Sequence, residues 1–255
     1  MKSFVAHATL AAALAVGAAC GRGPQTQAAD TSAASRDLVE SAEPERAQTT
    51  EERLPPGPPV APPADSEGLD ISSLGVDRGS PDAPVRIVEF SDYGCGYCRK
   101  FHQETWPVLA KDFVDTGKVE WKFLPFVLGM FDNSSHALLA AECALEQGMG
   151  PFEDMNGRIW DDQQTWKKSS DAARVLRGFA EEAGLDLKRY DACIGGGGRD
   201  GRIAAANQLA RQVGVRGTPT FFIVGYPPIQ GALPTETFRK VLDMVYADAT
   251  GNGAN

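Results

Sequence analysis

The residues best suited to chemistry are two cysteines three positions apart, Cys95 and Cys98, within the stretch VRIVEFSDYGCGYCRKFH. Such a pair can form a disulfide and exchange it with another protein, provided that one sulfur is available as a thiolate. The run from Val85 to Phe90 just before them is short, β-branched and aromatic, which predicts a buried strand. The reactive pair is therefore expected directly after a strand.

The residues that follow predict a helix that begins at the cysteine pair. Gly94 and Gly96 permit a tight turn, and an apolar face then continues beyond Pro107, where we expect a kink. Free N–H groups and the positive end of the helix dipole favour an anion, so Cys95 should lose its proton readily. We predict that Cys95 is the nucleophile and that Cys98, one turn further in, is the resolving thiol.

The same pair has two other interpretations. It could be an inert structural disulfide, or it could bind zinc or copper in an envelope protein together with His102, four residues after Cys98. A closed zinc site needs four ligands, and the sequence contains no second Cys-x-x-Cys or His pair. Redox chemistry is therefore the favoured interpretation.

The strand, the Gly-Cys-x-x-Cys turn and the helix, together with GTPTFFIVG at residues 217–225, resemble the DsbA-like branch of the thioredoxin superfamily. The resemblance covers about residues 75 to 248. It implies an α/β thioredoxin-like fold with an inserted helical domain, protein disulfide oxidoreductase activity and no dissociable cofactor. It also implies that Pro219 is cis and lies against the cysteines, where the backbone of Thr218 pairs with an extended substrate segment.

Two further side chains are candidate site residues. Glu89 lies in the predicted strand six residues before Cys95. If it is buried, its pKa should rise and it could exchange protons with the thiols, which is the role proposed for an acid here in the family. The alternative is a glutamate at a strand end that reaches solvent. The hydroxyl of Thr218 would lie near the nucleophile and could tune its pKa.

A second cysteine pair lies in the predicted helical insertion. Cys143 and Cys193 each have apolar neighbours at helical spacing, and in an oxidising compartment they are expected to form a structural disulfide. The alternative is two free buried thiols. The glycine run at residues 194–202 has no strand before it and no Gly-Lys-Ser/Thr after it, so we predict a mobile interhelical loop rather than a phosphate site.

The chain begins with features of a secretory signal peptide, predicted at residues 1–20. The sequence VGAAC resembles a bacterial lipobox, in which Cys20 would be lipidated, and cleavage at an Ala-x-Ala-like site is the alternative. Residues 21–70 are polar and then rich in proline, which predicts a disordered linker. The thioredoxin-like domain is predicted in two parts, 71–131 and 214–250, around a helical insertion at 132–213, with a disordered tail at 251–255.

These features predict an extracytoplasmic oxidoreductase, periplasmic or anchored to a membrane through an N-terminal lipid. Its partners would be cysteine-containing proteins and a membrane redox protein, either a quinone-linked oxidase or a reductant. A net charge of −9 argues against nucleic acid. Oxidation of substrates is favoured, but Gly96-Tyr97 between the cysteines lacks the Pro-His of strongly oxidising members, so a reductase or isomerase stays open. A redox-inert adaptor on the same scaffold is a further alternative.

Overall fold

The computed structural model describes residues 71–251. The predicted signal peptide, Cys20 and the proline-rich linker lie outside these residues, as does most of the predicted C-terminal tail. Among the described helices, none combines the length and the hydropathy that a membrane crossing requires.

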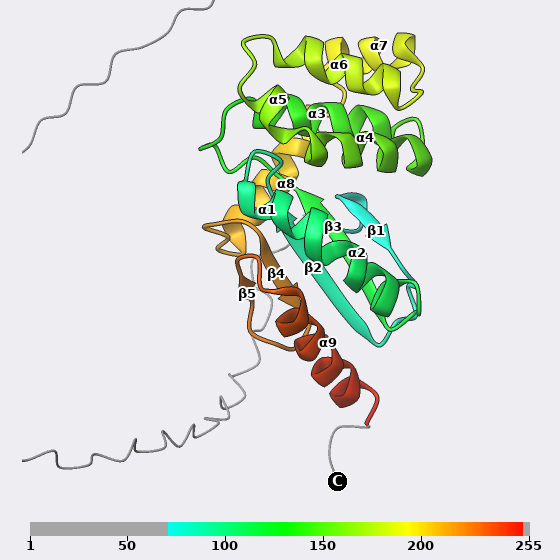
Figure 1. The fold of residues 1–255 in the computed structure, drawn as a ribbon, viewed down its shortest axis with the longest axis vertical. Helices are drawn as coiled ribbons and strands as arrows, with labels where there is room; N and C mark the ends of the chain where they lie inside the picture. The colour runs from blue at the N-terminus through cyan, green and yellow to red at the C-terminus, as the bar shows by residue number, and fades with distance from the viewer. Residues whose placement is uncertain (1–70, 252–255) are drawn as a thin grey trace, which may run out of the picture. The chain divides into compact units, whose positions relative to one another are not determined.

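A five-stranded mixed sheet forms the centre of the described part of the chain (Figure 1). Its strands lie in the order β1-β3-β2-β4-β5, and only β2 and β3 are parallel. Their bounds are β1 (Val76–Arg78), β2 (Val85–Ser91), β3 (Val119–Pro125), β4 (Thr220–Ile223) and β5 (Ile229–Gln230). This sheet and the helices around it confirm the predicted thioredoxin-like α/β fold.

The connection from β2 to β3 is the helical segment that carries the cysteines. It consists of α1 (Gly96–Lys100), η2 (Phe101–Thr105), α2 (Trp106–Leu109) and η3 (Ala110–Val114). The segments η2 and η3 have the wider hydrogen bonding of a π-helix, and they flank the turn that contains Pro107. Proline has no amide hydrogen to donate, so the regular α-helical ladder is interrupted where the kink was expected.

Each face of the sheet is covered by different helices. On one face α1, η2, α2 and α9 (Thr235–Ala249) enclose an aromatic core that includes Phe101, Trp121, Phe221 and Phe238. On the other face α8 (Asp200–Gln212) covers Phe90 and Leu124. Successive residues of β2 therefore point into different cores, and Glu89, next to Phe90, points into the aromatic one.

The helical insertion follows β3 and leads into α8. It contains α3 (Ser134–Leu145), α4 (Met149–Asp161), α5 (Gln163–Lys167), α6 (Ala172–Glu182) and α7 (Leu187–Gly196). Figure 1 shows these helices gathered beyond the end of the sheet at which α1 begins. A disulfide between Cys143 on α3 and Cys193 on α7 joins two of them, with an S–S distance of 2.01 Å.

One local prediction for the insertion was wrong. The glycine run is not simply a loop, because α7 extends through Gly196 and α8 already begins at Asp200. Only Gly197, in the left-handed conformation at φ 62°, and its two successors connect the two helices.

Candidate active site

Cys95 occupies the N-cap position of α1, where the extended strand geometry gives way to the helix. Its amide donates a hydrogen bond to the carbonyl of Asp92 at 2.9 Å, and its own carbonyl accepts from the amide of Arg99 at 3.1 Å. The first turn of the helix leaves amides without helical partners next to the sulfur. The predicted placement at a helix start is therefore found in the structure.

The surroundings of Cys95 lower its pKa to about 6. The largest cause is a hydrogen bond from the thiol of Cys98, and burial opposes it. The side chain of Thr218 and the backbone N–H groups of Tyr97 and Cys98 also lower the pKa. At neutral pH the Cys95 sulfur of the reduced protein is therefore mainly a thiolate.

The partner sulfur has the opposite character. Cys98 is completely buried, and its pKa is raised well above the ordinary thiol value by burial and by its interaction with Cys95. The two thiols differ in reactivity because only one of them lies at the helix start beside a cavity. This division agrees with a nucleophile at Cys95 and a resolving thiol at Cys98.

The Thr218–Pro219 peptide bond is cis, and its loop lies against the nucleophile. The Cys95 Sγ atom is 3.3 Å from the backbone carbonyl oxygen of Thr218, to which the neutral thiol donates a hydrogen bond. The Thr218 hydroxyl is buried and makes no hydrogen bond within residues 71–251. It is therefore free to donate one to the thiolate, in agreement with its effect on the pKa of Cys95.

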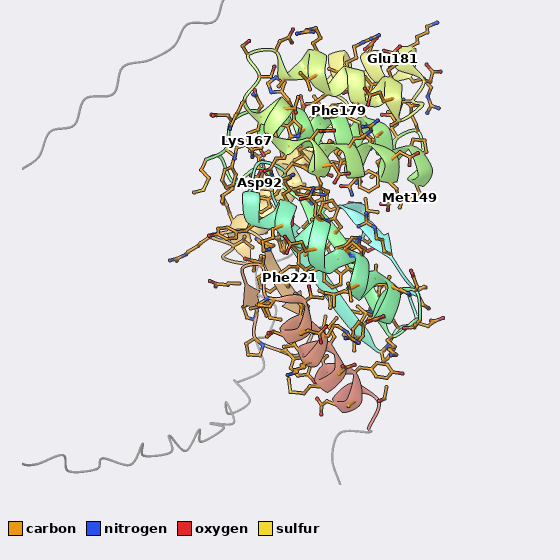
Figure 2. The ribbon with its side chains drawn as sticks, in the orientation of Figure 1. Asp92, Met149, Lys167, Phe179, Glu181 and Phe221 are labelled. Carbon is orange, nitrogen blue, oxygen red and sulfur yellow. A yellow bond between two sulfur atoms is a disulfide. The ribbon has the colours of Figure 1, made fainter. Side chains whose placement is uncertain are left out.

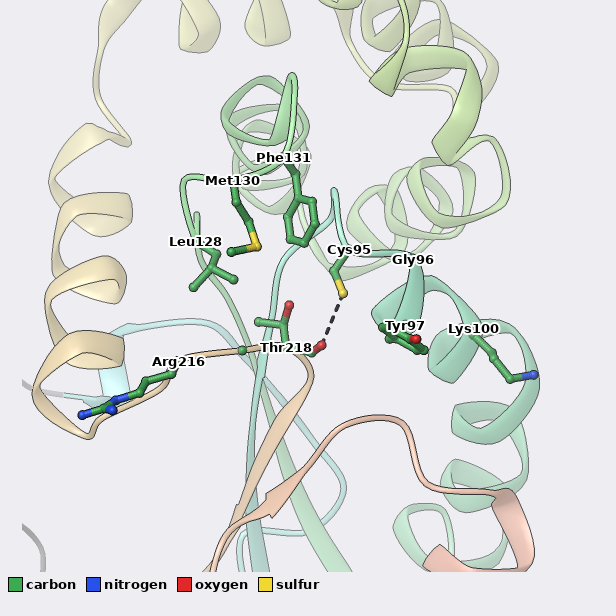
Figure 3. A pocket seen from close by; sticks show the side chains of 10 residues that line it. Cys95, Gly96, Tyr97, Lys100, Leu128, Met130, Phe131, Arg216 and Thr218 are labelled. Carbon is green, nitrogen blue, oxygen red and sulfur yellow. Dashed lines mark hydrogen bonds between the residues drawn. The ribbon is translucent and has the colours of Figure 1, made fainter.

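A mostly apolar cavity of about 510 Å³ lies beside the sulfur (Figure 3). Cys95 is only 4% exposed, but its sulfur lies at the wall of this cavity. The lining residues come from the start of α1, from the segment after β3 and from the loop before β4: Cys95, Gly96, Tyr97, Lys100, Leu128, Met130, Phe131, Arg216, Gly217 and Thr218. The nucleophile is therefore reachable from solvent even though little of its surface is exposed.

The prediction of a raised pKa for Glu89 was wrong. Glu89 is completely buried, which by itself raises the pKa, but attraction to His102 and hydrogen bonds from His102, Ser91 and Trp121 hold the pKa below its ordinary value. The Oε1 atom is 2.7 Å from His102 Nε2, and Oε2 accepts from Trp121 Nε1 at 2.9 Å. The side chain is thus a charged, fully hydrogen-bonded carboxylate inside the aromatic core.

Ser91 connects this carboxylate to the active-site cysteines, and the sequence interpretation missed it. Its hydroxyl donates to Glu89 Oε1, and it also interacts with the thiol of Cys98. Ser91 is two residues after Glu89 in the same strand, so the two side chains project from the same face. That spacing is a signal from which its role could have been inferred.

His102 does not join the cysteines as the metal-binding alternative requires. It is buried and hydrogen-bonded to Glu89, and its ring stacks on Trp160 with ring centroids 4.5 Å apart. Residues 71–251 contain no group of three His, Cys, Asp or Glu side chains placed to hold a metal ion. Its observed role is to be the partner of Glu89.

Asp92 fixes the turn between β2 and α1. Its carboxylate accepts from the amide of Gly94 at 2.9 Å and from that of Leu128 at 2.7 Å, and it also accepts from the hydroxyl of Ser134. Burial raises the pKa of Asp92, and these three bonds oppose the rise. Ser134 is the first residue of α3, so Asp92 also anchors the start of that helix.

Comparison with known proteins places the chain in a family. The family model described as Thioredoxin (Thioredoxin_4) matches residues 74–244. The chain belongs to this thioredoxin family. The predicted resemblance to DsbA-like members of the superfamily is thereby supported at the level of family and fold.

Two relatives share sequence with this chain. The chain is 35% identical over 155 residues to disulfide bond formation protein D of Bacillus subtilis. The aligned region is 57% of this chain and 65% of that protein. It is 34% identical over 168 residues to Na(+)/H(+) antiporter NhaA 3 of Salinispora tropica, covering 63% of this chain but only 24% of the antiporter. The chain thus spans less than two thirds of the length of either relative.

The fold has counterparts among solved thioredoxin-like structures. Alpha-DsbA1 of Wolbachia pipientis superimposes with a TM-score of 0.62 at 22% identity, covering 71% of this chain and 97% of that structure. This likeness confirms the predicted fold.

Proposed function

We propose that this protein is an extracytoplasmic thiol–disulfide oxidoreductase that oxidises cysteine pairs of substrate proteins through Cys95 and Cys98. The observation that supports the proposal most strongly is the pairing of a Cys95 thiol of pKa about 6, beside a cavity, with a completely buried Cys98. The name of the Bacillus subtilis relative, disulfide bond formation protein D, agrees with it.

In this reaction a substrate thiolate attacks the Cys95 sulfur of the Cys95–Cys98 disulfide. The bond between the two protein sulfurs breaks, a mixed disulfide forms, and Cys98 leaves with the electron pair and takes up a proton. A second substrate thiolate then attacks the substrate sulfur of the mixed disulfide and releases Cys95 as a thiolate. Two substrate thiols are oxidised to a disulfide, and both electrons reside on the protein. The low pKa of Cys95 makes it a good leaving group in the last step.

Protons that enter or leave the buried Cys98 need a path, and Ser91 is next to it. We infer that the Ser91 hydroxyl passes a proton between Cys98 and Glu89. His102 holds the carboxylate in place through its 2.7 Å contact. Glu89 thus keeps the proton-exchange role expected from the sequence, but it reaches the sulfur through a hydroxyl and as a carboxylate of lowered pKa.

The substrate would lie in the cavity as an extended segment paired with the backbone of Thr218. The apolar side chains of Leu128, Met130 and Phe131 form one wall, and Met130 is 67% exposed. In Figure 3 the side chains of Arg216 and Lys100 point away from the sulfur on opposite sides. Unfolded segments with apolar residues next to a cysteine fit this surface best.

The direction of the reaction depends on whether the protein stabilises the reduced or the oxidised form of the Cys95–Cys98 pair. A stable thiolate at Cys95 favours the reduced protein, and a protein that favours its reduced form is an oxidant. Disulfide reduction or isomerisation is the alternative, and it would use the same two sulfurs.

Equilibration with glutathione tests both the activity and its direction. The oxidised protein should oxidise a reduced two-cysteine peptide, whereas Cys95→Ser should not. In a glutathione buffer set to the midpoint potential of glutathione, the Cys95–Cys98 pair should be mainly reduced. A mainly oxidised protein under these conditions would favour the reductase. A wild type no faster than Cys95→Ser would refute the proposed activity and favour a redox-inert adaptor.

We also propose an extracytoplasmic location with Cys20 as a lipid anchor and a membrane redox partner, a quinone-linked oxidase or a reductant. The disulfide between Cys143 and Cys193 supports an oxidising compartment, because such bonds rarely persist in a reducing one. Mass spectrometry of the mature protein from bacterial membranes should find a lipid on Cys20. A mature chain that begins at a residue other than Cys20 and carries no lipid would contradict the anchor.

A further inference from the structure

One short helix of the insertion contacts three consecutive carbonyl groups of the active-site turn. The side-chain amide of Gln163, on α5, donates to the carbonyls of Tyr93 at 2.6 Å and Cys95 at 2.9 Å. The ammonium of Lys167, one turn further along α5, donates to the carbonyl between them, that of Gly94, at 2.5 Å. Gln163 is completely buried, so its amide cannot exchange these partners for water.

The helix α5 is itself fixed against the same turn from its other end. The side-chain amide of Asn133 donates to the carbonyls of Trp166, Lys167 and Ser169. The next residue, Ser134, donates to the carboxylate of Asp92. Figure 2 labels Lys167 and Asp92 at this junction between the insertion and the sheet. The turn is therefore held by donors on one side and anchored through Asp92 on the other.

The direction of these carbonyl groups matters for the nucleophile. A carbonyl oxygen carries partial negative charge and would destabilise a nearby thiolate, whereas an N–H group stabilises it. Donors that bind the carbonyl oxygens of Tyr93, Gly94 and Cys95 offset the partial negative charge of these oxygens next to the nucleophile. Without these donors that negative charge would act more strongly on the thiolate.

We propose that Gln163 and Lys167 are positioning residues for the Cys95 nucleophile, holding the carbonyl groups of the turn that carries it and offsetting their partial negative charge. The inference rests on the proposed function and assigns part of the active site to the helical insertion. The titratable and charged groups around Cys95 are Cys98, Tyr97 and Lys100 from α1, Asp92 from the β2–α1 turn, Lys167 from α5 and Arg216 from the loop before β4.

Lys167 has a second contact that extends its effect to the cavity. Its ammonium lies 4.7 Å from the ring centroid of Phe131, which lines the cavity. A Cβ atom at Gly94 would lie 2.3 Å from the Cβ of Phe131, so only glycine allows this close approach. One cation therefore contacts both the turn that carries the nucleophile and the cavity wall.

The test measures the pH dependence of Cys95 alkylation in reduced protein, which needs no substrate. Gln163→Glu keeps the size of the side chain but replaces the donor with an acceptor, and Lys167→Met removes the cation. We expect each to raise the pKa of Cys95 by about one unit, a tenfold loss of thiolate relative to thiol at a fixed pH below the pKa. The reduction potential should fall by about 30 mV for each tenfold change in the thiol–disulfide equilibrium.

Lys167→Arg should retain most of the wild-type pKa, because a guanidinium can donate to the same carbonyl. Lys168→Met, at the exposed neighbouring position, is the matched control and should titrate like the wild type. If Gln163→Glu does not fold, the three lysine variants decide the matter. The variants could fold and unfold at a lower temperature while the pKa of Cys95 stays at its wild-type value. That result would give α5 a structural role only and would overturn the inference.

These outcomes are separate from those for the proposed function. Failure of the wild type to oxidise a reduced peptide would refute the function, whatever the variants do. Wild-type titration of Cys95 in both Gln163→Glu and Lys167→Met would refute the positioning role even if the wild type oxidises the peptide.

Discussion

The two sulfurs of the Cys-x-x-Cys pair differ because one lies at the end of a helix and the other within it. Cys95 receives a hydrogen bond from its partner and faces the first amides of α1, so its charged form is stabilised. Cys98 is enclosed in the aromatic core, where a charge is costly. A substrate can therefore approach only Cys95, and Cys98 exchanges its bond with Cys95 alone.

Alkylation of the reduced protein should report this difference. The rate of iodoacetamide reaction at Cys95 should rise with pH along one titration with a midpoint of about 6, because the thiolate is the reacting species. Cys98 should stay unmodified while the protein is folded, since it is buried. Trypsin leaves both cysteines in one peptide, so fragmentation of that peptide in the mass spectrometer distinguishes the two sites. A midpoint near that of a free cysteine would contradict the assigned role of Cys95.

The buried carboxylate of Glu89 should make folding depend on pH. Its pKa is lower in the folded than in the unfolded chain, so the stabilisation is present above the ordinary pKa of 4.5 and is lost as the pH falls through the folded value. Glu89→Gln should lose about 3 kcal/mol of unfolding free energy at pH 7, since His102 would lose a charged partner. Below pH 4.5 its stability should fall less steeply than that of the wild type.

Urea denaturation between pH 3 and pH 7 measures both effects. Glu104→Gln is the control, because that side chain is exposed and pairs with Lys100 at the surface. Equal pH dependence in Glu89→Gln and the wild type would refute the charged state assigned to Glu89.

The hydroxyl of Ser91 should affect one step of the exchange reaction. Ser91→Ala removes the group between Glu89 and Cys98, so the attack of Cys98 on a mixed disulfide at Cys95 should slow by at least about tenfold. Formation of that mixed disulfide from the reduced protein, by attack of Cys95 on a peptide disulfide, should be unchanged, because Cys95 keeps its own contacts. Rapid quenching and mass spectrometry separate the two steps, and Ser135→Ala on the exposed side of α3 is the control. Slowing of both steps alike would argue against a proton path.

At the scale of elements, the cysteine-bearing helix is held between the sheet and the insertion. Arg99, on α1, donates to the carbonyls of Trp160 and Asp161 near the end of α4. Tyr93, in the preceding turn, donates to Asn156 on the same helix. The insertion therefore supports the active-site helix as well as covering one end of the sheet.

The disulfide between α3 and α7 should stabilise this insertion. It closes a sequence separation of 50 residues, and its removal in Cys143→Ala/Cys193→Ala should cost about 4 kcal/mol of unfolding free energy through the greater entropy of the unfolded chain. Chemical denaturation measures the loss. A reduction potential of the Cys95–Cys98 pair identical to that of the wild type would show that the second disulfide is structural and not regulatory.

Local sequence signals predicted the elements that depend on nearby residues. The apolar run ending at Phe90, the glycines of the turn and the cysteine spacing were sufficient to predict strand, turn and helix. The charge state of Glu89 was not predictable in this way, because its partners His102 and Trp121 come from η2 and β3. The contacts of Gln163 lie about 70 residues away along the chain, so no local pattern could indicate them.

At the scale of the whole molecule, the chain combines an acidic balance with a cavity whose charged lining residues are basic. The net charge is −9, whereas the cavity is lined by Lys100 and Arg216 and by apolar side chains. This arrangement favours recognition through backbone pairing and apolar contact over recognition of a charged ligand. It agrees with the proposed binding of extended, cysteine-containing segments.

The central claim is that Cys95 forms a covalent mixed disulfide with substrate cysteines. Cys98→Ser removes the resolving thiol, so the oxidant must be supplied by a peptide that carries an activated disulfide. Mass spectrometry should then find one peptide attached through Cys95, at a rate that rises with pH through a midpoint below that of a free cysteine, because Thr218 and backbone N–H groups still lower the pKa of Cys95. An adduct that fails to form, or that forms no faster than on a free cysteine, would contradict the proposed disulfide exchange.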